Sequence, residues 1–252
     1  MSGLPASSPP ESAALIRALA AHPEQMATLI QSLHRRAVDT ESLLDLMGRL
    51  ARQAVRILDG VGWAGVTVQF DGEQPLTAAH TDERVMVVDE HQYAGGDGPC
   101  LRAMRSGEAV AMTAAEVTRA WPRLGRIARQ VGVHSFLALP LHVQGRTIAV
   151  LNFYSAAERV PVPDPDFLIV LAEYAGRGFT DYQAHQPPPV TSDALRVALA
   201  EWVVVEQAVG VLMQTYGFSA DYAMDVLSDQ AQDWNRTRLE QAMFILDITP
   251  SN

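Results

Sequence analysis

The sequence predicts an α+β domain, in which helices flank an antiparallel sheet, followed by an all-α domain of three helices. Three observations support this division. Strand-type alternation is confined to the segment between Trp63 and Tyr154, helical periodicity flanks that segment, and every segment after the proline run at 187–189 has a helical period. The length of 252 residues suits one large domain or two small ones.

The charge of the chain excludes several functions. Nineteen basic and 29 acidic residues give a net charge of −10, and every basic residue is arginine. Without lysine there is no Schiff-base lysine and no P-loop lysine. A negative chain also disfavours nonspecific binding to nucleic acid or to an anionic membrane. The single cysteine, Cys100, cannot form an intrachain disulfide or a thiolate zinc cluster, so we expect a cytoplasmic location.

We expect no targeting signal in the N-terminal segment. Residues 1–11 have neither a basic nor an apolar stretch of the kind found in signal peptides, so we expect a disordered tail. Charge-free apolar runs stay well short of the roughly 20 residues that span a bilayer, and no membrane association is expected. Residues 12–39 have helical periodicity that is broken at His22-Pro23, which predicts two short helices.

Residues 40–184 carry the predicted α+β domain. Asp39 or Thr40 is a suitable cap for the first helix of this domain. The alternation that begins at Trp63 then predicts a strand that ends before an Asp71-Gly72 turn. Further strands are predicted at Leu76–His80 and at Val85–Val88.

The second half of the same domain shows equally local signals. Thr113 and Glu116 have the spacing of a capping box. The other predicted elements are a helix from Pro122 to Gly132, a hairpin of strands 135–143 and 147–154 about Gln144-Gly145, and a helix from Asp164-Pro165 to Tyr182.

A proline-rich linker at 185–190 leads into the helical domain, residues 191–252. The first of its helices, 194–215, is apolar nearly all round and ends before Gly217. The second helix is expected to be capped by Ser219 and the third by Asn235. A helix that is apolar on two sides needs two covers. We expect the second cover from another chain or from the N-terminal domain.

Several motifs of the first domain resemble those of the GAF family, which implies that residues 40–184 sense a ligand or signal. The matching segments are Gly95-Gly96-Asp97-Gly98-Pro99-Cys100-Leu101-Arg102-Ala103, Trp121-Pro122, Gly132-Val133-His134-Ser135, Leu139-Pro140-Leu141 and Leu151-Asn152-Phe153-Tyr154-Ser155.

A ligand pocket of this family would lie between the sheet and the 95–105 connection. The polar tips of Tyr93 and Trp121 could orient a ligand there. The candidate lining residues are Val68, Tyr93, Cys100, Trp121, Phe136, Leu139, Asn152 and Tyr154. The alternative is that most of them are ordinary core, because any half-buried sheet needs alternating apolar residues. The residues identify neither the ligand nor a cofactor.

Cys100 has two interpretations. A redox or haem-linked role would need a low thiol pKa or a partner group. A small buried residue at a helix start is the simpler alternative, since free cysteine is among the most buried residue types. A lone cysteine also speaks against the GAF-fold methionine sulfoxide reductases, which work through more than one.

The C-terminal helices resemble the ANTAR domain of transcription antitermination regulators, which implies binding of paired RNA hairpins, typically by a dimer. The matching residues are Val205-Glu206-Gln207-Ala208, Gly210-Val211-Leu212-Met213, Ala223, Leu227, Asn235 and Ala242. The chain departs from the family where Trp202, Val209 and Thr237 replace basic residues and where Arg238 replaces a leucine. Residues 191–252 hold three arginines against nine acidic residues, a net charge of −6.

The start of the third helix is the candidate RNA site. Arginines beside a helix N-terminus oppose its dipole, and a bound phosphate would relieve that conflict. The candidate RNA-binding residues are Asn235, Arg236, Arg238 and Arg196. The alternative is that Arg236 and Arg238 are solvated and pair with Asp233 and Glu240.

A basic ridge is predicted along the helices after Thr113. Its members are Arg119, Arg123, Arg126 and Arg129, spaced by four, three and three residues. Such runs are usually solvated helix faces. We also consider the hypothesis that this ridge docks on the acidic C-terminal domain, of the same chain or a partner, and holds the protein in an off state.

Catalytic and metal-site motifs are missing from the sequence. The seven histidines are scattered, and no HExxH, Walker, dinucleotide or Gly-x-Ser-x-Gly motif occurs. We therefore expect no enzyme and no metal site. The sequence predicts a dimeric regulator that senses a signal and binds RNA hairpins. The alternative is a dimeric signalling or interaction protein whose ANTAR-like domain has lost RNA binding.

Overall fold

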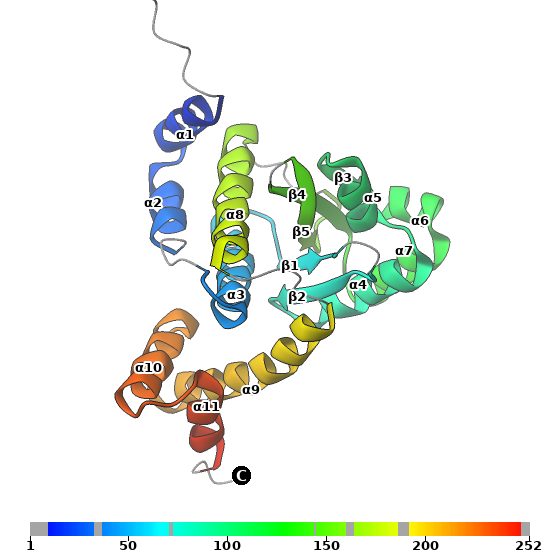
Figure 1. Cartoon of the computed structure of the whole chain (residues 1–252). Helices are drawn as coiled ribbons and strands as arrows, with labels where there is room; N and C mark the ends of the chain where they lie inside the picture. The colour runs from blue at the N-terminus through cyan, green and yellow to red at the C-terminus, as the bar shows by residue number, and fades with distance from the viewer. Residues whose placement is uncertain are drawn as a thin grey trace, which may run out of the picture. The chain divides into compact units, whose positions relative to one another are not determined.

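The computed structural model describes residues 10–32, 37–70, 73–143, 145–159, 164–185 and 192–247. The chain divides into two compact units, residues 1–188 and 189–252. Figure 1 shows the sheet and its helices in the first unit and α9 to α11 in the second.

The first unit is built on a five-stranded antiparallel sheet of order β2-β1-β5-β4-β3. The strands are β1 (Trp63–Val68), β2 (Leu76–His80), β3 (Val110–Thr113), β4 (Ser135–Val143) and β5 (Arg146–Ser155). The predicted strands at 63 and 76 and the predicted 135–154 hairpin are confirmed. The Asp71-Gly72 turn and Gln144 lie outside the described residues.

The predicted strand at Val85–Val88 is wrong, because these residues lie in helix α4 (Glu83–Gly95). Asp82 caps this helix by accepting a hydrogen bond from the backbone N–H of Arg84. The buried positions of the helix are Val85, Val88, Asp89 and Gln92. They recur at intervals of three, one and three residues, which is a helical face. Two of the four buried residues are polar, so the helical period of apolar residues is incomplete in this segment, and the sequence alone did not indicate a helix.

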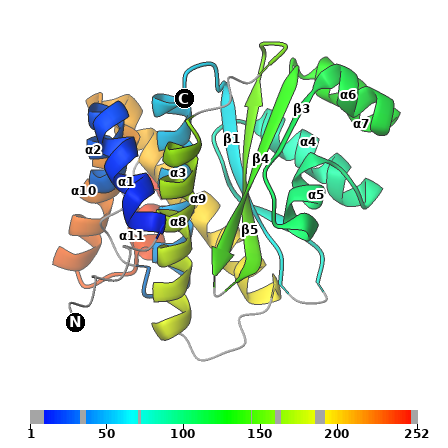
Figure 2. The same cartoon turned by 90° about the horizontal axis from the view of Figure 1, so that it is seen from above.

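Helices cover both faces of the sheet, as Figure 2 shows. One face carries α3 (Thr40–Ile57) and α8 (Pro165–His185), and the other carries α4, α5 (Pro99–Ser106), α6 (Ala114–Ala120) and α7 (Pro122–Gln130). Of the two caps considered for α3, Asp39 is the one present, and it forms a capping box with Ser42. The predicted capping box of Thr113 and Glu116 is present at the start of α6. The predicted helices from Pro122 and from Pro165 are confirmed.

Two N-terminal helices, α1 (Pro10–Ala21) and α2 (Pro23–Ser32), pack against α8 and α3 on the side away from the sheet (Figure 2). The predicted break at His22-Pro23 is confirmed. Arg17 donates two hydrogen bonds to Asp166, at 2.6 and 2.7 Å, and His22 Nε2 lies 3.3 Å from Asp164. These contacts attach α1 to the first turn of α8.

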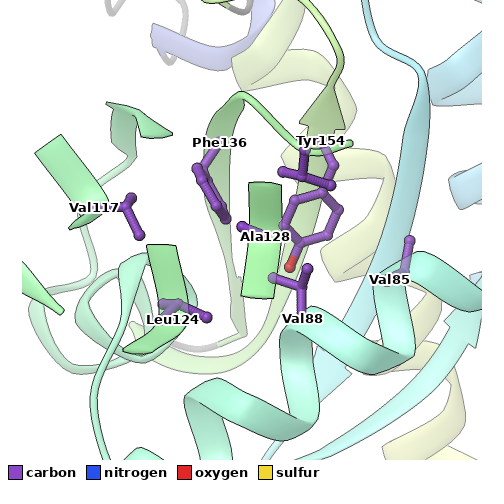
Figure 3. Close-up of a cluster of buried hydrophobic side chains, with 8 residues drawn as sticks. Val85, Val88, Val117, Leu124, Ala128, Phe136 and Tyr154 are labelled. Carbon is purple, nitrogen blue, oxygen red and sulfur yellow. The ribbon is translucent and has the colours of Figure 1, made fainter. Parts of the chain in front are cut away.

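An apolar cluster fills the space between the sheet and helices α4, α6 and α7 (Figure 3). Its buried members are Val85, Val88, Val117, Leu124, Ala128, Val133, Phe136 and Tyr154. Phe136 packs edge-on against Tyr154, with ring centroids 5.6 Å apart. The cluster fixes α4 against β4 and β5, and it directs the Tyr154 hydroxyl toward α4 (Figure 3).

The second unit contains helices α9 (Ser192–Tyr216), α10 (Ala220–Asp233) and α11 (Arg238–Asp247). The predicted helix at 194–215 and its end before Gly217 are confirmed by α9. The predicted Ser219 cap of α10 is also confirmed. The buried apolar residues of these helices include Trp202, Val205, Ala208, Leu212, Ala223, Leu227, Ala242 and Ile245. No helix in the described parts of the chain is long and apolar enough to cross a membrane.

The predicted cap of the third helix at Asn235 is wrong. Asn235 has a φ of +50°, and the backbone N–H of Arg236 donates to the carbonyl of Ala231 at 2.8 Å, so these residues close the C-terminal end of α10. Thr237 caps α11 instead. Its hydroxyl accepts from the N–H of Glu240 at 3.1 Å, and the Glu240 carboxylate accepts from the N–H of Thr237 at 2.8 Å.

Candidate functional site

A buried carboxyl group lies at the centre of the first unit. Asp89, on α4, has no exposed surface. The Tyr154 hydroxyl donates to its Oδ1 atom, Gln92 Nε2 donates to the same oxygen at 3.1 Å, and the Thr77 hydroxyl donates to Oδ2 at 3.0 Å. These donors come from α4, β2 and β5, so the carboxyl joins the helix to the sheet through neutral partners.

The hydrogen bonds continue across the sheet toward α5. The Tyr93 hydroxyl lies 2.8 Å from the hydroxyls of both Thr67 and Thr77. Asn152 Nδ2 donates to the Thr67 hydroxyl at 2.9 Å and to Cys100 Sγ at 3.3 Å. Gln92 Oε1 accepts from the backbone N–H of Cys100 at 2.9 Å. We call Asp89, Gln92, Tyr93, Cys100, Thr67, Thr77, Asn152 and Tyr154 the polar cluster.

Two glycines allow the polar cluster to close. A Cβ atom at Gly98 would lie 2.5 Å from Gln92 Oε1, and one at Gly65 would lie 2.5 Å from Val85 Cγ1. Gly98 precedes α5 and Gly65 lies on β1 beneath α4. Their missing side chains let Gln92 reach the start of α5 and let α4 approach the sheet.

Burial controls the proton affinities within the polar cluster. Loss of solvation raises the pKa of Asp89 to about 6, against the opposing hydrogen bonds from Tyr154, Thr77 and Gln92. Burial, together with the charge of Asp89, also raises the pKa of Tyr93 and Tyr154 well above the ordinary tyrosine value. The carboxyl is therefore the group of the polar cluster whose charge changes closest to neutral pH.

Four of the predicted pocket residues belong to the polar cluster: Tyr93, Cys100, Asn152 and Tyr154. They come from α4, α5 and β5, and their side chains fill the space beneath the 95–105 connection. Phe136 contacts one of these four, Tyr154, through its ring edge.

Trp121 lies at the edge of the apolar cluster, and its polar tip already has a partner. The indole N–H donates to Asp97 at 3.0 Å, and Arg102 stacks over the ring at 4.1 Å. Burial alone would raise the pKa of Asp97, but hydrogen bonds from Trp121, the Gly98 backbone and Arg105 lower it. The indole is therefore held by the connection between α4 and α5.

Two predicted pocket residues, Val68 and Leu139, face away from the polar cluster. Successive side chains of a strand alternate between faces. Thr67 and Phe136 face α4. Val68 is one residue from Thr67 and Leu139 is three residues from Phe136, so both side chains lie on the opposite face, toward α3 and α8. Leu139 lines a shallow groove of about 420 Å³, whose other walls include Pro140, His142, Leu168, Ile169 and Ala172.

The central residue of the polar cluster, Asp89, has a weak signature in the sequence. Asp89, Gln92, Thr67 and Thr77 escaped prediction because charged and polar side chains are ordinarily assigned to the surface. One usable signal was present. Asp89 and Gln92 continue the helical face of Val85 and Val88, so a helical assignment of this segment would have placed both inside.

The Cys100 thiol is poorly suited to nucleophilic chemistry. Burial, with a smaller effect of the Asp89 charge, raises the pKa of Cys100 to about 12, so the thiol is protonated at neutral pH. Among the described residues, no group of three or more His, Cys, Asp or Glu side chains could hold a metal ion.

An exposed aromatic and cationic surface lies at the turn between α10 and α11. Trp234 is 70% exposed and Phe244 is 45% exposed. The Arg236 guanidinium lies 4.5 Å from the Phe244 ring centroid and 6.0 Å from that of Trp234. Arg236 also donates to Gln241 Oε1 at 3.0 Å. We call Trp234, Arg236 and Phe244 the aromatic–arginine surface.

The predicted RNA-binding residues occupy different places in the second unit. Asn235 and Arg236 lie in the turn, and Arg238 is the first residue of α11. Arg196 is exposed near the start of α9. The predicted pairing of Arg236 with acidic residues is replaced by Gln241 and the Phe244 ring, while Glu240 serves the Thr237 cap.

The positions at which this chain departs from the ANTAR pattern are informative. Trp202 and Val209 are each only 6% exposed, and Thr237 is the helix cap. A cation would be costly at either buried position and would oppose the helix dipole at Thr237. The missing cations therefore reflect packing and capping in this chain.

Family models match both units. Residues 40–179, more than half of the chain, match a model described as GAF domain, and residues 193–246 match one described as ANTAR domain. A comparison with curated proteins found no match. The order of a sensing domain and an ANTAR domain is that of a signal-sensing regulator.

Several solved structures are similar to the chain. The GAF domain of an Acinetobacter phosphoenolpyruvate-protein phosphotransferase is 14% identical, with 73% of this chain and 100% of that chain covered and a TM-score of 0.47. The free methionine-R-sulfoxide reductase of Neisseria meningitidis is 19% identical, with coverages of 73% and 98% and a TM-score of 0.45. The assignment of the fold depends on the family models, not on these structures.

Proposed function

Because the chain belongs to the GAF domain family and carries an ANTAR domain after it, we propose that it is a signal-responsive regulator that binds RNA hairpins and controls transcription antitermination. The polar cluster is the proposed sensing site. The proposed RNA contact is the aromatic–arginine surface, together with Asn235, Arg238 and Arg196. We propose that the protein acts in the cytoplasm and without catalysis, in keeping with a buried, protonated Cys100.

The observation that carries this proposal is the aromatic–arginine surface. Exposed aromatic rings and guanidinium planes stack on the unpaired bases of hairpin loops, and each stacked base contributes about 1–3 kcal/mol. Arg236 is positioned for this by Gln241, which itself donates to Gln230 of α10 at 3.0 Å. The surface thus combines exposed rings with a guanidinium held in place.

The test is binding of a two-hairpin RNA to the full chain, measured by fluorescence anisotropy. Loss of a stacked ring costs about 1–3 kcal/mol per base, so Trp234→Ala is expected to weaken binding by roughly 5- to 150-fold. Arg236→Gln is expected to weaken binding as well. Tyr222→Ala, another exposed ring of α10, and Arg177→Gln, an exposed arginine of α8, are matched controls.

The acidity of the second unit favours a second candidate function. With three arginines against nine acidic residues in 191–252, the helices could serve only for pairing with another copy in a signalling or interaction protein. Failure of the wild-type chain to bind hairpin RNA at 50 mM salt would reject RNA binding and leave this second function. Equal affinities of the Trp234 variant and its control would reject the aromatic–arginine surface as the contact.

We also propose that the protein is a homodimer. Large apolar side chains of α9 remain exposed, with Val197 61% and Val203 51% exposed. A helix with apolar residues on several sides needs a cover beyond that given by two short neighbours. A second copy of the second unit is the proposed cover.

A further inference from the structure

The basic ridge consists of four exposed arginines on two consecutive helices of the first unit. Arg119 lies in the last turn of α6, and Arg123, Arg126 and Arg129 lie along α7. All four are exposed. The inner side of α7 is fixed by Leu124, Gly125 and Ala128, which are buried; Figure 3 shows the first and last of these within the apolar cluster. The ridge is thus held by a packed helix.

Three of the ridge arginines, on α7, differ from several other arginines of the first unit, which have an aspartate partner. Arg17, Arg49, Arg84 and Arg105 each pair with an aspartate. In the part of the chain that the structure describes, the guanidinium groups of Arg123, Arg126 and Arg129 form no ion pair.

An acidic residue that interacts with the ridge is Glu116, on the first turn of α6. Hydrogen bonds from the backbone and hydroxyl of Thr113 lower the pKa of this carboxyl, and the charges of Arg119 and Arg159 add to the effect. Like charges three and four residues apart on a helix repel one another. An anion from outside the first unit would therefore interact favourably with the ridge, because it would relieve this repulsion.

We propose that the basic ridge binds the phosphates of the RNA whose loops contact the second unit. This inference depends on the proposed RNA-binding function and deepens it, because it moves the phosphate contacts onto the sensing unit. The second unit, at −6, is poorly equipped for counterion release, whereas four arginines within eleven residues are well suited to it. Guanidinium groups also bind phosphate through two parallel hydrogen bonds.

The charge balance makes RNA phosphate the occupant that best fits the ridge. A polyanion offers a phosphate to each of several guanidinium groups, and the four arginines lie on two consecutive helices with no acidic residue between them in the sequence. A signal sensed in the same unit could then change RNA affinity directly, since α7 packs through Ala128 and Leu124 against the apolar cluster that holds Tyr154.

The test compares two full-length variants of equal charge. One replaces Arg119, Arg123, Arg126 and Arg129 by Gln. The control replaces the exposed arginines Arg56, Arg84, Arg146 and Arg177 by Gln. Both lose four positive charges, and circular dichroism and thermal unfolding establish that both are folded. Dissociation constants for the two-hairpin RNA are measured from 50 to 300 mM salt.

The ridge variant is expected to bind RNA more weakly than the control at 50 mM salt. Its plot of log affinity against log salt is also expected to be shallower by about 3, since each lost phosphate contact removes roughly 0.7–0.9 from the slope. Equal slopes in the two variants would overturn the proposal while leaving RNA binding by the second unit intact. Tighter RNA binding by the ridge variant would also overturn it, and would indicate that the ridge engages an acidic protein surface. A wild-type chain that binds no RNA would overturn both the ridge proposal and the proposed function.

Discussion

At the scale of single residues, Asp89 combines complete burial with partners that are all uncharged. Tyr154, Thr77 and Gln92 donate hydrogen bonds to it, yet the loss of solvation still raises its pKa to about 6. The folded protein therefore holds this proton more firmly than the unfolded chain does. The contribution of Asp89 to stability is complete below the ordinary aspartate pKa and is lost as the pH rises through about 6.

The substitution Asp89→Asn is expected to remove this pH dependence. Asparagine keeps the shape and one acceptor oxygen but cannot ionise. The rise in the pKa of Asp89 to about 6 corresponds to about 3 kcal/mol, so the variant is expected to gain roughly that much stability relative to the wild type between pH 4 and pH 7. Urea unfolding at a series of pH values measures the difference in stability between the two proteins. Hydrogen exchange of the β5 amides is measured afterwards at the same pH values.

Asp97→Asn is the matched control, because the pKa of Asp97 is lowered by its hydrogen bonds instead of raised. The stabilising contribution of Asp97 is present above the ordinary aspartate pKa and is lost as the pH falls. The two variants are therefore expected to alter the pH profile in opposite directions. Parallel profiles for the wild type and Asp89→Asn would contradict the assignment of Asp89 as a group that is charged at neutral pH and buried.

At the scale of elements, the turn between α10 and α11 shows how one residue type serves two helix ends. Asparagine tolerates positive φ and is common at helix C-termini, but it is also a good N-terminal cap. In this chain Asn235 takes the first role and Thr237 takes the second. The turn places Arg236 between the two ends, over the Phe244 ring.

The substitution Thr237→Ala is expected to destabilise α11 by about 1 kcal/mol, because a capping hydroxyl is lost. Asn235→Gly is expected to leave stability equal or slightly raised, since glycine adopts positive φ without strain. Thermal unfolding of the full chain followed by circular dichroism provides the comparison. A larger loss from Asn235→Gly than from Thr237→Ala would restore Asn235 as the cap.

Most elements of the fold were predictable because their signals are local. The caps at Asp39, Thr113 and Ser219 and the hairpin about Gly145 depend on neighbouring residues alone. The polar cluster was not predictable in this way. Its carboxyl is stabilised inside by donors from β2 and β5, which are distant in sequence, and Gln92 fits only because Gly98 has no side chain. The burial of this carboxyl therefore depends on contacts between distant segments, which the local sequence pattern does not reveal.

At the scale of the whole molecule, the proposed dimer has a direct test. Light scattering after gel filtration is expected to give about 55 kDa, twice the 27.4 kDa of the chain. Val203→Asp, on α9, is expected to yield monomers, because it places a carboxylate on the proposed apolar interface. Ile169→Asp on α8, 45% exposed, is the matched control and is expected to remain dimeric. A monomeric wild type at micromolar concentration would contradict the dimer.

The strand order of the sheet has a consequence for how the protein is made. β2-β1 and β4-β3 are joined only through β5, and Trp63 pairs with Tyr154, about ninety residues later. At ~5–20 residues per second, roughly 4 to 16 s separate the synthesis of β1 from that of β5. During that interval the edge of β1 that will pair with β5 remains unpaired on the ribosome. The nascent chain is therefore most exposed to chaperones and to strand-pairing errors just before the central strand emerges.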